Sequence, residues 1–356
     1  MRKRVYGWRS SKTPTDLSSR TNGWRSSKTP TDLSSRTNEC KIRQHPKTEI
    51  SGKQPLISLL TDFGRDESAY LIKSAIDYVN PNARVTDITH SVPPFNILSG
   101  AWRLSRVVTA KTEREGTIYV AVVDPGVGGG RECIIVRTKT GKYLVGPDNG
   151  LLSLAFQAEG IDTAVSIDNS ELTLLSLADS VTFHGKDVFG PAAAHLAAGV
   201  HISEFGERLE ESTLKEIALD SRSDATSRTG ALVDIDDFGT LRTNLPNHLH
   251  ESILGKQVDL FILNRDPSLL GARFRWGDNI ISQGKVFVRD TFEGSAKDET
   301  IAVLSSTGCL DIAVNLGSAA KKLGSTHDHI ILDESLRPAT WVHLDFNGRE
   351  AIPIGV

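Results

Sequence analysis

The chain has 356 residues, of which 38% are hydrophobic, and this length and composition fit two globular domains of ordinary size. The formal net charge of −3 argues against a general nucleic-acid binder, and no run of roughly 18 uncharged apolar residues is present to span a membrane. The three cysteines are scattered and match neither a zinc spacing nor a disulfide framework, so we expect a reducing compartment and no metal site.

The first 53 residues differ from the rest because they are polar and contain a tandem copy. The 16-residue unit Gly7–Asn22 recurs unchanged as Gly23–Asn38. Two short polar units cannot bury a core, so we predict a disordered extension over residues 1–53. Its richness in Arg and Ser also resembles an organelle transit peptide, but disorder without targeting is favoured, and we expect a cytoplasmic protein.

Strands and helices alternate over residues 54–208, which predicts an α/β catalytic domain with a mostly parallel sheet covered on both faces. Pro81 ends the first expected helix. The expected strands are 55–60, 84–88, 118–123, 133–137 and 143–146, and the expected helices are 68–80, 97–109, 151–158 and 192–198.

Two acidic residues follow buried strands of this domain directly. Asp62 comes after the first strand, and Asp124 comes after the apolar strand 118–123, before a proline and a Gly-rich loop. Open α/β sheets bind ligands at this edge. Arg131 is close enough for the loop to fold it back onto Asp124, although a plain strand and turn with a surface arginine explains the stretch equally well. His184 precedes a glycine at a loop–helix junction, where a ring can point into a cleft, although a lone histidine is more often structural.

The second half of the chain changes character. Residues 209–228 are charged and Ser-rich and are expected to be a linker. Beyond them, short strands separated by turn residues predict an antiparallel all-β domain over residues 229–323, either a barrel or a sandwich. The polar segment Ile235–Asn244 is expected to be its first loop, and the sequence assigns no role to the tail 324–356. The expected strands are 231–235, 258–264, 284–288, 300–304 and 310–314.

Six motifs follow one another between residues 55 and 323. They are TDFG at 61–64, VDPGVG at 123–128 with Arg131, GPDNGLL at 146–152, TFHGKDVF at 182–189, DDFGTLRTN at 236–244 and SSTGCLDIAVNLGSAA at 305–320. Together they resemble the adenosine-forming S-adenosyl-L-methionine (SAM) hydrolases, also called SAM hydroxide adenosyltransferases. This family is related to fluorinase and chlorinase.

The resemblance implies a hydrolase whose catalytic set is Asp124, Arg131 and His184. The halogenating relatives carry a tyrosine at the position of Asp124, so this chain resembles the water-using branch. Gly185 stands where fluorinase has a halide-contacting serine, although chlorinase also has glycine there. The resemblance further implies a homotrimer with sites at the subunit interfaces. We expect no cofactor and no metal, and the charge and composition argue against a nucleic-acid or membrane partner.

The resemblance also implies which residues contact the substrate, SAM. The matching positions are Asp62 for the ribose hydroxyls, Asp236 and Ser306 for the methionine part, Phe183 and Phe238 for aromatic walls, Asn315 for adenine and, more weakly, Asn244. Two departures affect the amino-acid end. Thr240 stands where an asparagine is usual, and Thr307 replaces an arginine that fluorinase has beside its serine.

The implied chemistry is a nucleophilic substitution in which water or hydroxide attacks the ribose C5′ and methionine leaves. In one reading, Asp124 holds the water and accepts its proton, while the cation of Arg131 favours the ionised carboxylate. In the other, Arg131 and His184 stabilise a hydroxide-like nucleophile, and Asp124 orients His184. The sequence does not choose between them.

Two other functions remain open at this point. A SAM- or nucleoside-binding sensor without turnover is motivated by the departures at Thr240 and Thr307. A halide-using SAM lyase is disfavoured by Asp124.

Overall fold

Six strands form the sheet of the α/β domain in the computed structural model, which describes residues 55–177, 182–264 and 280–346. The prediction for residues 1–53 falls outside these ranges. The strands are β1 (Leu56–Thr61), β2 (Arg84–Thr89), β3 (Ile118–Val122), β4 (Cys133–Thr138), β5 (Tyr143–Pro147) and β6 (Ile161–Ser166). Their order is β2-β1-β3-β5-β4-β6, and only the pairings of β4 with β5 and β6 are antiparallel. The predicted mostly parallel sheet is confirmed, whereas β6 was not predicted.

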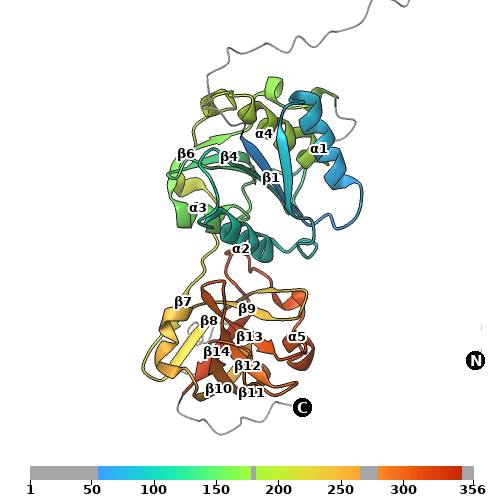
Figure 1. The fold of residues 1–356 in the computed structure, drawn as a ribbon. Helices are drawn as coiled ribbons and strands as arrows, with labels where there is room; N and C mark the ends of the chain where they lie inside the picture. The colour runs from blue at the N-terminus through green and yellow to red at the C-terminus, as the bar shows by residue number, and fades with distance from the viewer. Residues whose placement is uncertain (1–54, 178–181, 265–279, 347–356) are drawn as a thin grey trace, which may run out of the picture. The chain divides into compact units, whose positions relative to one another are not determined.

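Helices cover both faces of this sheet, as predicted (Figure 1). Helices α1 (Ser68–Val79) and α4 (Gly190–Ala197) share one core cluster with the sheet, and α2 (Ile97–Val108) and α3 (Ser153–Glu159) share another. The amide of Asn96 caps α2 by accepting a hydrogen bond from Ser99 N at 2.9 Å. Among the described residues, no helix is long and apolar enough to cross a membrane.

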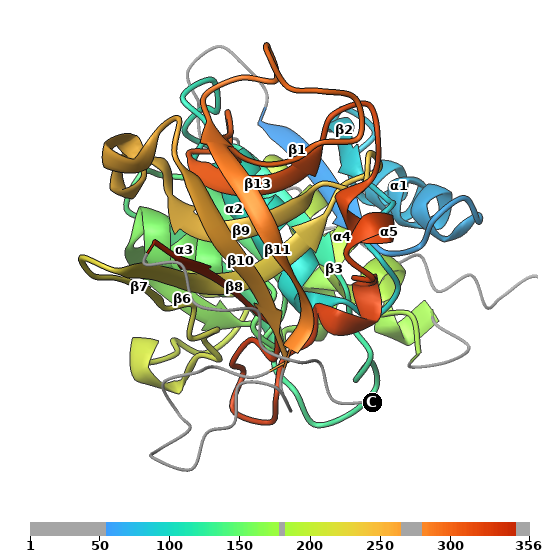
Figure 2. The same ribbon diagram turned by 90° about the horizontal axis from the view of Figure 1, so that it is seen from below.

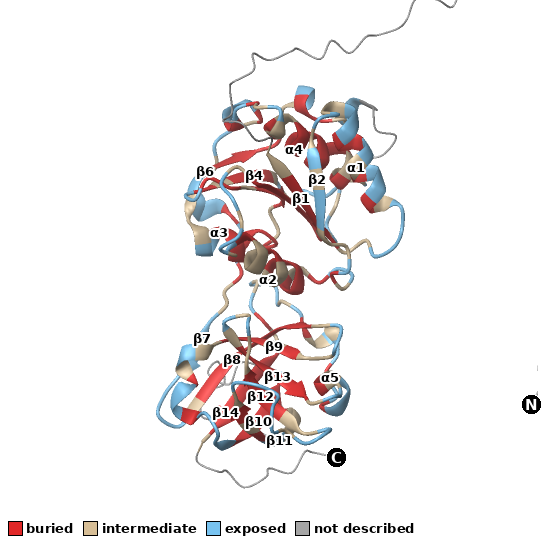
Figure 3. Cartoon of the chain, viewed as in Figure 1, coloured by how far each residue is buried: buried red, intermediate tan, exposed pale blue. Residues whose placement is uncertain are grey.

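The central strand β3 determines where the polar residues of this domain lie. All five of its residues are buried, while the edge strand β2 is largely exposed (Figure 3). Strands β1 and β3 pair in parallel with Thr61 opposite Val122, so their carboxyl ends coincide. Asp62 and Asp124 therefore emerge at the same edge of the sheet.

Seven strands close the second domain into a barrel (Figure 2). Their order is β14-β10-β11-β12-β13-β9-β8, and β8 pairs back onto β14, while β7 lies beside β8. The strands are β7 (Ser221–Ser223), β8 (Ser227–Ile235), β9 (Leu241–Pro246), β10 (Gln257–Leu263), β11 (Ile280–Arg289), β12 (Thr300–Leu304), β13 (Cys309–Val314) and β14 (Trp341–Asp345). The expectation of an antiparallel domain is wrong for one pair, because β11 and β12 run parallel.

Two further segments of the barrel differ from the sequence analysis. The expected loop Ile235–Asn244 is a turn followed by β9, whose Leu241, Thr243 and Leu245 are fully buried. Strand β9 pairs with both β8 and β13, but Gly239 and the aspartates before it suggest a loop in the sequence. The segment after Leu323, to which the sequence assigned no role, contains β14, which closes the barrel.

The α/β domain and the barrel are joined through the buried carboxylate of Asp234 on β8. Its oxygens accept hydrogen bonds from Ser99 Oγ at 2.5 Å and from Arg103 Nε at 2.9 Å, both on α2. The side chain of Asp234 is only 4% exposed, and a buried charge of this kind is stabilised when it is paired and hydrogen-bonded.

Replacing Leu344 with alanine tests the role of β14. Leu344 is fully buried in the barrel core, so Leu344→Ala should lower the free energy of unfolding by about 2–5 kcal/mol, measured by chemical denaturation. The control Ile331→Ala removes a side chain that is 53% exposed and should change stability by no more than about 0.5 kcal/mol. Equal stability of the two variants would exclude β14 from the core.

Candidate active site

The guanidinium of Arg131 joins the three residues predicted to be catalytic. Its Nε lies 3.1 Å from both carboxylate oxygens of Asp124, and its Nη2 also donates to Asp124 Oδ2. The same Nη2 lies 2.9 Å from Nδ1 of His184. The structure therefore brings the set together, but with one correction: Arg131, and not Asp124, orients His184, because the arginine lies between the other two.

Neighbouring motifs hold this cluster in place. Asn149, from the GPDNGLL motif, donates a hydrogen bond of 2.9 Å to the carbonyl of Val123, the residue before Asp124. His184 begins a short π-helix, Gly185–Phe189, that runs into α4. Such π-turns occur frequently at functional sites. A Cβ added at Gly185 would lie 2.9 Å from Cδ1 of the buried Ile72, so the glycine allows close packing of the π-helix on α1.

Two residues that the sequence analysis did not single out complete the surroundings of Arg131. Its Nη1 lies 3.0 Å from Cys133 Sγ, and its guanidinium carbon lies 5.6 Å from the centroid of the fully buried Phe189 ring. The same ring meets His184 edge-on at 6.3 Å. Phe189 is the last residue of the TFHGKDVF motif, and Cys133 is the first residue of the strand after Arg131. Nothing in the local sequence indicates that either residue contacts Arg131.

Burial and the charges in the cluster together determine the protonation of His184. Burial lowers the pKa of Arg131, but the hydrogen bonds and charges of Asp124 and Cys133 together outweigh this effect and leave the pKa raised. Burial and the neighbouring Arg131 cation lower the pKa of His184. Because a guanidinium has only donors, Nδ1 of His184 accepts, and the proton of the neutral ring is on Nε2. His184 therefore presents a donor and not a base.

Asp62 is held by the backbone beside this cluster. Its Oδ2 accepts a hydrogen bond of 2.8 Å from Phe95 N. Burial raises the pKa of Asp62, the bond from Phe95 partly opposes the shift, and the negative charge of Asp124 adds to it. Phe95 has a φ of 64° and is 72% exposed, an unusual conformation for a non-glycine residue that marks it as a candidate site residue missed in the sequence. The predicted wall residue Phe183 packs edge-on against Phe63, with centroids 5.7 Å apart.

The remaining predicted residues lie in the barrel domain, four of them around a cavity of about 960 Å³. Asp236, Phe238, Ser306 and Asn315 all line it, and every lining residue comes from the barrel domain. Asn244 is not among them. Its amide is buried between strands, where it accepts from Ala231 N at 2.7 Å and donates to the carbonyl of Asp220 at 2.9 Å.

The loop after β8 presents Phe238 to solvent. Oδ1 of Asp236 accepts hydrogen bonds from Phe238 N at 3.0 Å and Thr240 N at 2.9 Å. Gly239 has a φ of 79°, and a Cβ there would lie 2.0 Å from Ser318 Oγ, so only glycine fits. Because its backbone is fixed in this way, Phe238 can remain 82% exposed in a defined place.

The predicted residues thus form two groups. Asp62, Asp124, Arg131, Phe183 and His184 belong to the α/β domain, whereas Asp236, Phe238, Ser306 and Asn315 belong to the barrel. Within the described ranges, no group of three His, Cys, Asp or Glu side chains could hold a metal ion.

An α/β domain followed by a β-barrel, with an Asp–Arg–His cluster at the sheet edge, defines a two-domain class of proteins. Residues 57–206 match the family model described as the SAM hydroxide adenosyltransferase N-terminal domain, and residues 230–331 match that of the C-terminal domain. The chain therefore belongs to the SAM hydroxide adenosyltransferase family.

Individual proteins show the same likeness. An (R)-S-adenosyl-L-methionine hydrolase from Salinispora tropica is 34% identical over 76% of this chain and 95% of its own length. A fluorinase from an Actinoplanes species is 25% identical over 59% of this chain and 78% of its own. The crystal structure of an uncharacterized conserved protein from Thermotoga maritima, 28% identical, superimposes with a TM-score of 0.67 over 81% of this chain and 99% of its own.

Replacing Arg131 with methionine should raise the pKa of His184. In the wild type this pKa lies below the ordinary value of 6.5, in part because of the Arg131 cation, and removing the cation leaves the Asp124 carboxylate to favour the charged ring. An NMR titration of the histidine ring signals measures the shift. Signals of histidines far from Arg131 provide the internal control. An unchanged His184 curve would contradict the contact.

Proposed function

We propose that this protein hydrolyses SAM to adenosine and L-methionine. The observation that carries the proposal is the contact of Arg131 with both Asp124 and His184 in a chain of this family. The names of the relatives at 31–34% identity, all (R)-S-adenosyl-L-methionine hydrolases, support it.

The reaction is a displacement at the ribose C5′. The oxygen of water forms a bond to C5′, the C5′–S bond breaks, and methionine leaves as a neutral thioether. One proton is released, because a sulfonium cation and water give two neutral products. The sulfonium is already a good leaving group, so we expect neither a metal nor a cofactor to take part. Alignment of the water with the C5′–S bond can contribute up to about 7–11 kcal/mol in the best intramolecular cases.

The contacts of His184 and Asp124 suggest how the proton leaves. His184 offers its Nε2 hydrogen to the oxygen of the water and orients it, because its Nδ1 is occupied by Arg131. Asp124 then accepts the proton. A carboxylate is a weak base, but the attacking oxygen becomes strongly acidic as the C–O bond forms. A carboxylate of modest basicity therefore suffices, and a free hydroxide is not required.

The substrate is held by both groups of residues in this proposal. Asp62 accepts hydrogen bonds from the two ribose hydroxyls, which a single carboxylate can do. Phe183 and the exposed Phe95 form an apolar wall at the sulfonium, where loss of charge during the reaction favours the transition state. The residues proposed to hold the two ends of the substrate are Phe238 and Asn315 for adenine and Asp236 and Ser306 for methionine. Asn244 is left out because backbone groups already bind its amide.

We further propose that the (R) epimer at sulfur is the preferred substrate, because the relatives that resemble the chain over most of its length carry this epimer in their names. A cytoplasmic, reducing compartment fits Cys133 and Cys309, which are both free thiols.

The division of the residues between two domains supports the homotrimer that the family resemblance implies. The cavity with Phe238 and Asn315 is lined by barrel residues alone, and the Asp124 cluster comes from the α/β domain alone. We propose that the barrel of one subunit covers the catalytic edge of the next, and that three such sites form around a ring.

Incubation of the purified protein with each SAM epimer, in buffer containing chloride, tests the activity. The expected products are adenosine and methionine, formed faster from the (R) epimer and separated by mass. Asp124→Asn should lower kcat by at least about 100-fold, in line with the loss of a proton acceptor, and leave SAM binding nearly unchanged. Formation of 5′-chloro-5′-deoxyadenosine would assign the protein to the halide-using branch. SAM that is bound but unchanged would assign it to the sensors.

A complementation experiment tests the shared sites. The wild type should have three times the chain mass of 38.7 kDa by light scattering. The Asp124→Asn and Phe238→Ala variants should each be nearly inactive alone. Co-expressed in equal amounts, they should regain about one quarter of wild-type activity. Random mixing of the two kinds of subunit places an intact catalytic edge beside an intact barrel at that frequency. No recovery would place each site within a single chain.

A further inference from the structure

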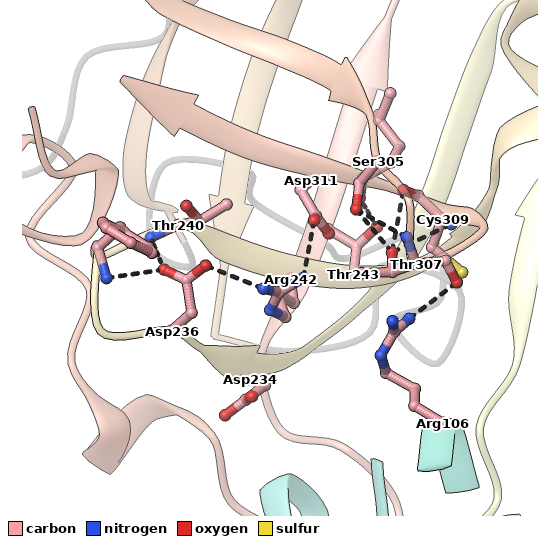
Figure 4. Close-up of polar contacts among 12 residues, drawn as sticks. Arg106, Asp234, Asp236, Thr240, Arg242, Thr243, Ser305, Thr307, Cys309 and Asp311 are labelled. Atoms are coloured by element: carbon pink, nitrogen blue, oxygen red, sulfur yellow. Dashed lines mark hydrogen bonds and ion pairs between the residues drawn. The ribbon is translucent and has the colours of Figure 1, made fainter. Parts of the chain in front are cut away.

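The wall of the barrel cavity contains a cation held between two carboxylates (Figure 4). Nη1 of Arg242 lies 3.1 Å from Oδ2 of Asp311, and Nη2 lies 2.9 Å from Oδ2 of Asp236. The Arg242 side chain is 23% exposed, so part of it reaches the cavity surface. A guanidinium fixed at two points keeps its orientation when a ligand enters.

We propose that Arg242 is the specificity-determining residue that binds the α-carboxylate of the substrate's amino-acid end. This inference rests on the proposed function. In this proposal the barrel cavity binds both the ammonium and the carboxylate of the amino-acid end.

Binding of a zwitterion requires an anionic and a cationic side chain next to each other. The ammonium and carboxylate groups of an amino acid are attached to the same carbon, and Asp236 and Arg242 are in direct contact in the cavity wall. Asp236, which the proposed function places at the methionine end, is the acceptor for the ammonium. A guanidinium has five N–H donors, and the ion pairs with the two aspartates use two of them, so Arg242 retains donors for a carboxylate.

Asp311 acts as a positioning residue for Arg242. Its side chain is 3% exposed, and its Oδ1 is buried without a hydrogen-bond partner of standard geometry among the described residues. Burial raises the pKa of Asp311 to about 6, against the opposing effects of Ser305, Arg242 and Arg106. At neutral pH the carboxylate is therefore ionised and holds Arg242 from the side opposite Asp236.

The neighbouring groups make Arg242 the best candidate. Thr307 is uncharged. Its hydroxyl accepts a hydrogen bond from Cys309 N within the turn, and its carbonyl accepts one of 2.9 Å from Arg106. Arg106 extends from α2 and does not line the cavity. Lys321 lines the cavity on the short helix α5 (Ala319–Lys322), without an ion pair to fix its amine among the described residues. It is therefore a matched control of equal charge.

The test compares SAM with decarboxylated SAM, which keeps the amine and lacks the carboxylate. The wild type should prefer SAM to decarboxylated SAM because its KM for SAM is lower. In Arg242→Met the ratio of the two kcat/KM values should fall by about 10- to 100-fold, the usual effect of losing a hydrogen bond to a charged group, while kcat for SAM changes little. Arg242→Lys should keep part of the preference, and Lys321→Met should keep all of it.

Calorimetric binding of adenosine, which has no amino-acid end, verifies that each variant is folded. An unchanged preference in an Arg242→Met protein that still binds adenosine would overturn the assignment, as would a loss of preference in Lys321→Met. If the wild type does not turn over SAM, the proposed function fails by itself. The affinities of the wild type and of Arg242→Met for the two compounds then still decide the role of Arg242.

Discussion

A single guanidinium organises the catalytic edge of the α/β domain. Arg131 donates to Asp124, His184 and Cys133 and lies over the ring of Phe189, so nearly all its hydrogen-bonding capacity is used. This fixes the tautomer of His184 and keeps the charge of Asp124 paired in a site that is largely closed to water. A buried ion pair contributes little to stability by itself, and its value here lies in the geometry it imposes.

The sheet topology supplies the other half of that geometry. Because β1 and β3 are parallel neighbours in register, the acids that follow them emerge together, and Asn149 from the loop after β5 ties down the end of β3. Residues far apart in the sequence are thereby assembled with little help from flexible loops. The barrel uses a different method, in which turn residues such as Gly239 fix the backbone and exposed side chains are presented from it.

The sequence predicted the features that depend on local pattern. Helix periodicity located α1 and α2, and acids placed after apolar runs located Asp62 and Asp124. It did not predict features that depend on long-range packing. Strand β9 was taken for a loop because turn residues precede it, and β14 received no role because its partners lie some eighty residues or more away in the chain. Likewise, no local signal shows that Arg131 lies between Asp124 and His184, or that Arg242 lies between two aspartates.

The close packing of Gly185 has an evolutionary consequence. Fluorinase carries a serine at this position, and here the first atom of any side chain would meet Ile72 of α1 at 2.9 Å. A mutational route from this water-using protein toward a halide pocket therefore has to shift the side chain of Ile72 when position 185 gains a Cβ. Since Ile72 is fully buried in the core between α1 and the sheet, that shift has to be accommodated by close-packed neighbours. Substitution at position 185 is constrained by the core of the domain as well as by the chemistry at Asp124.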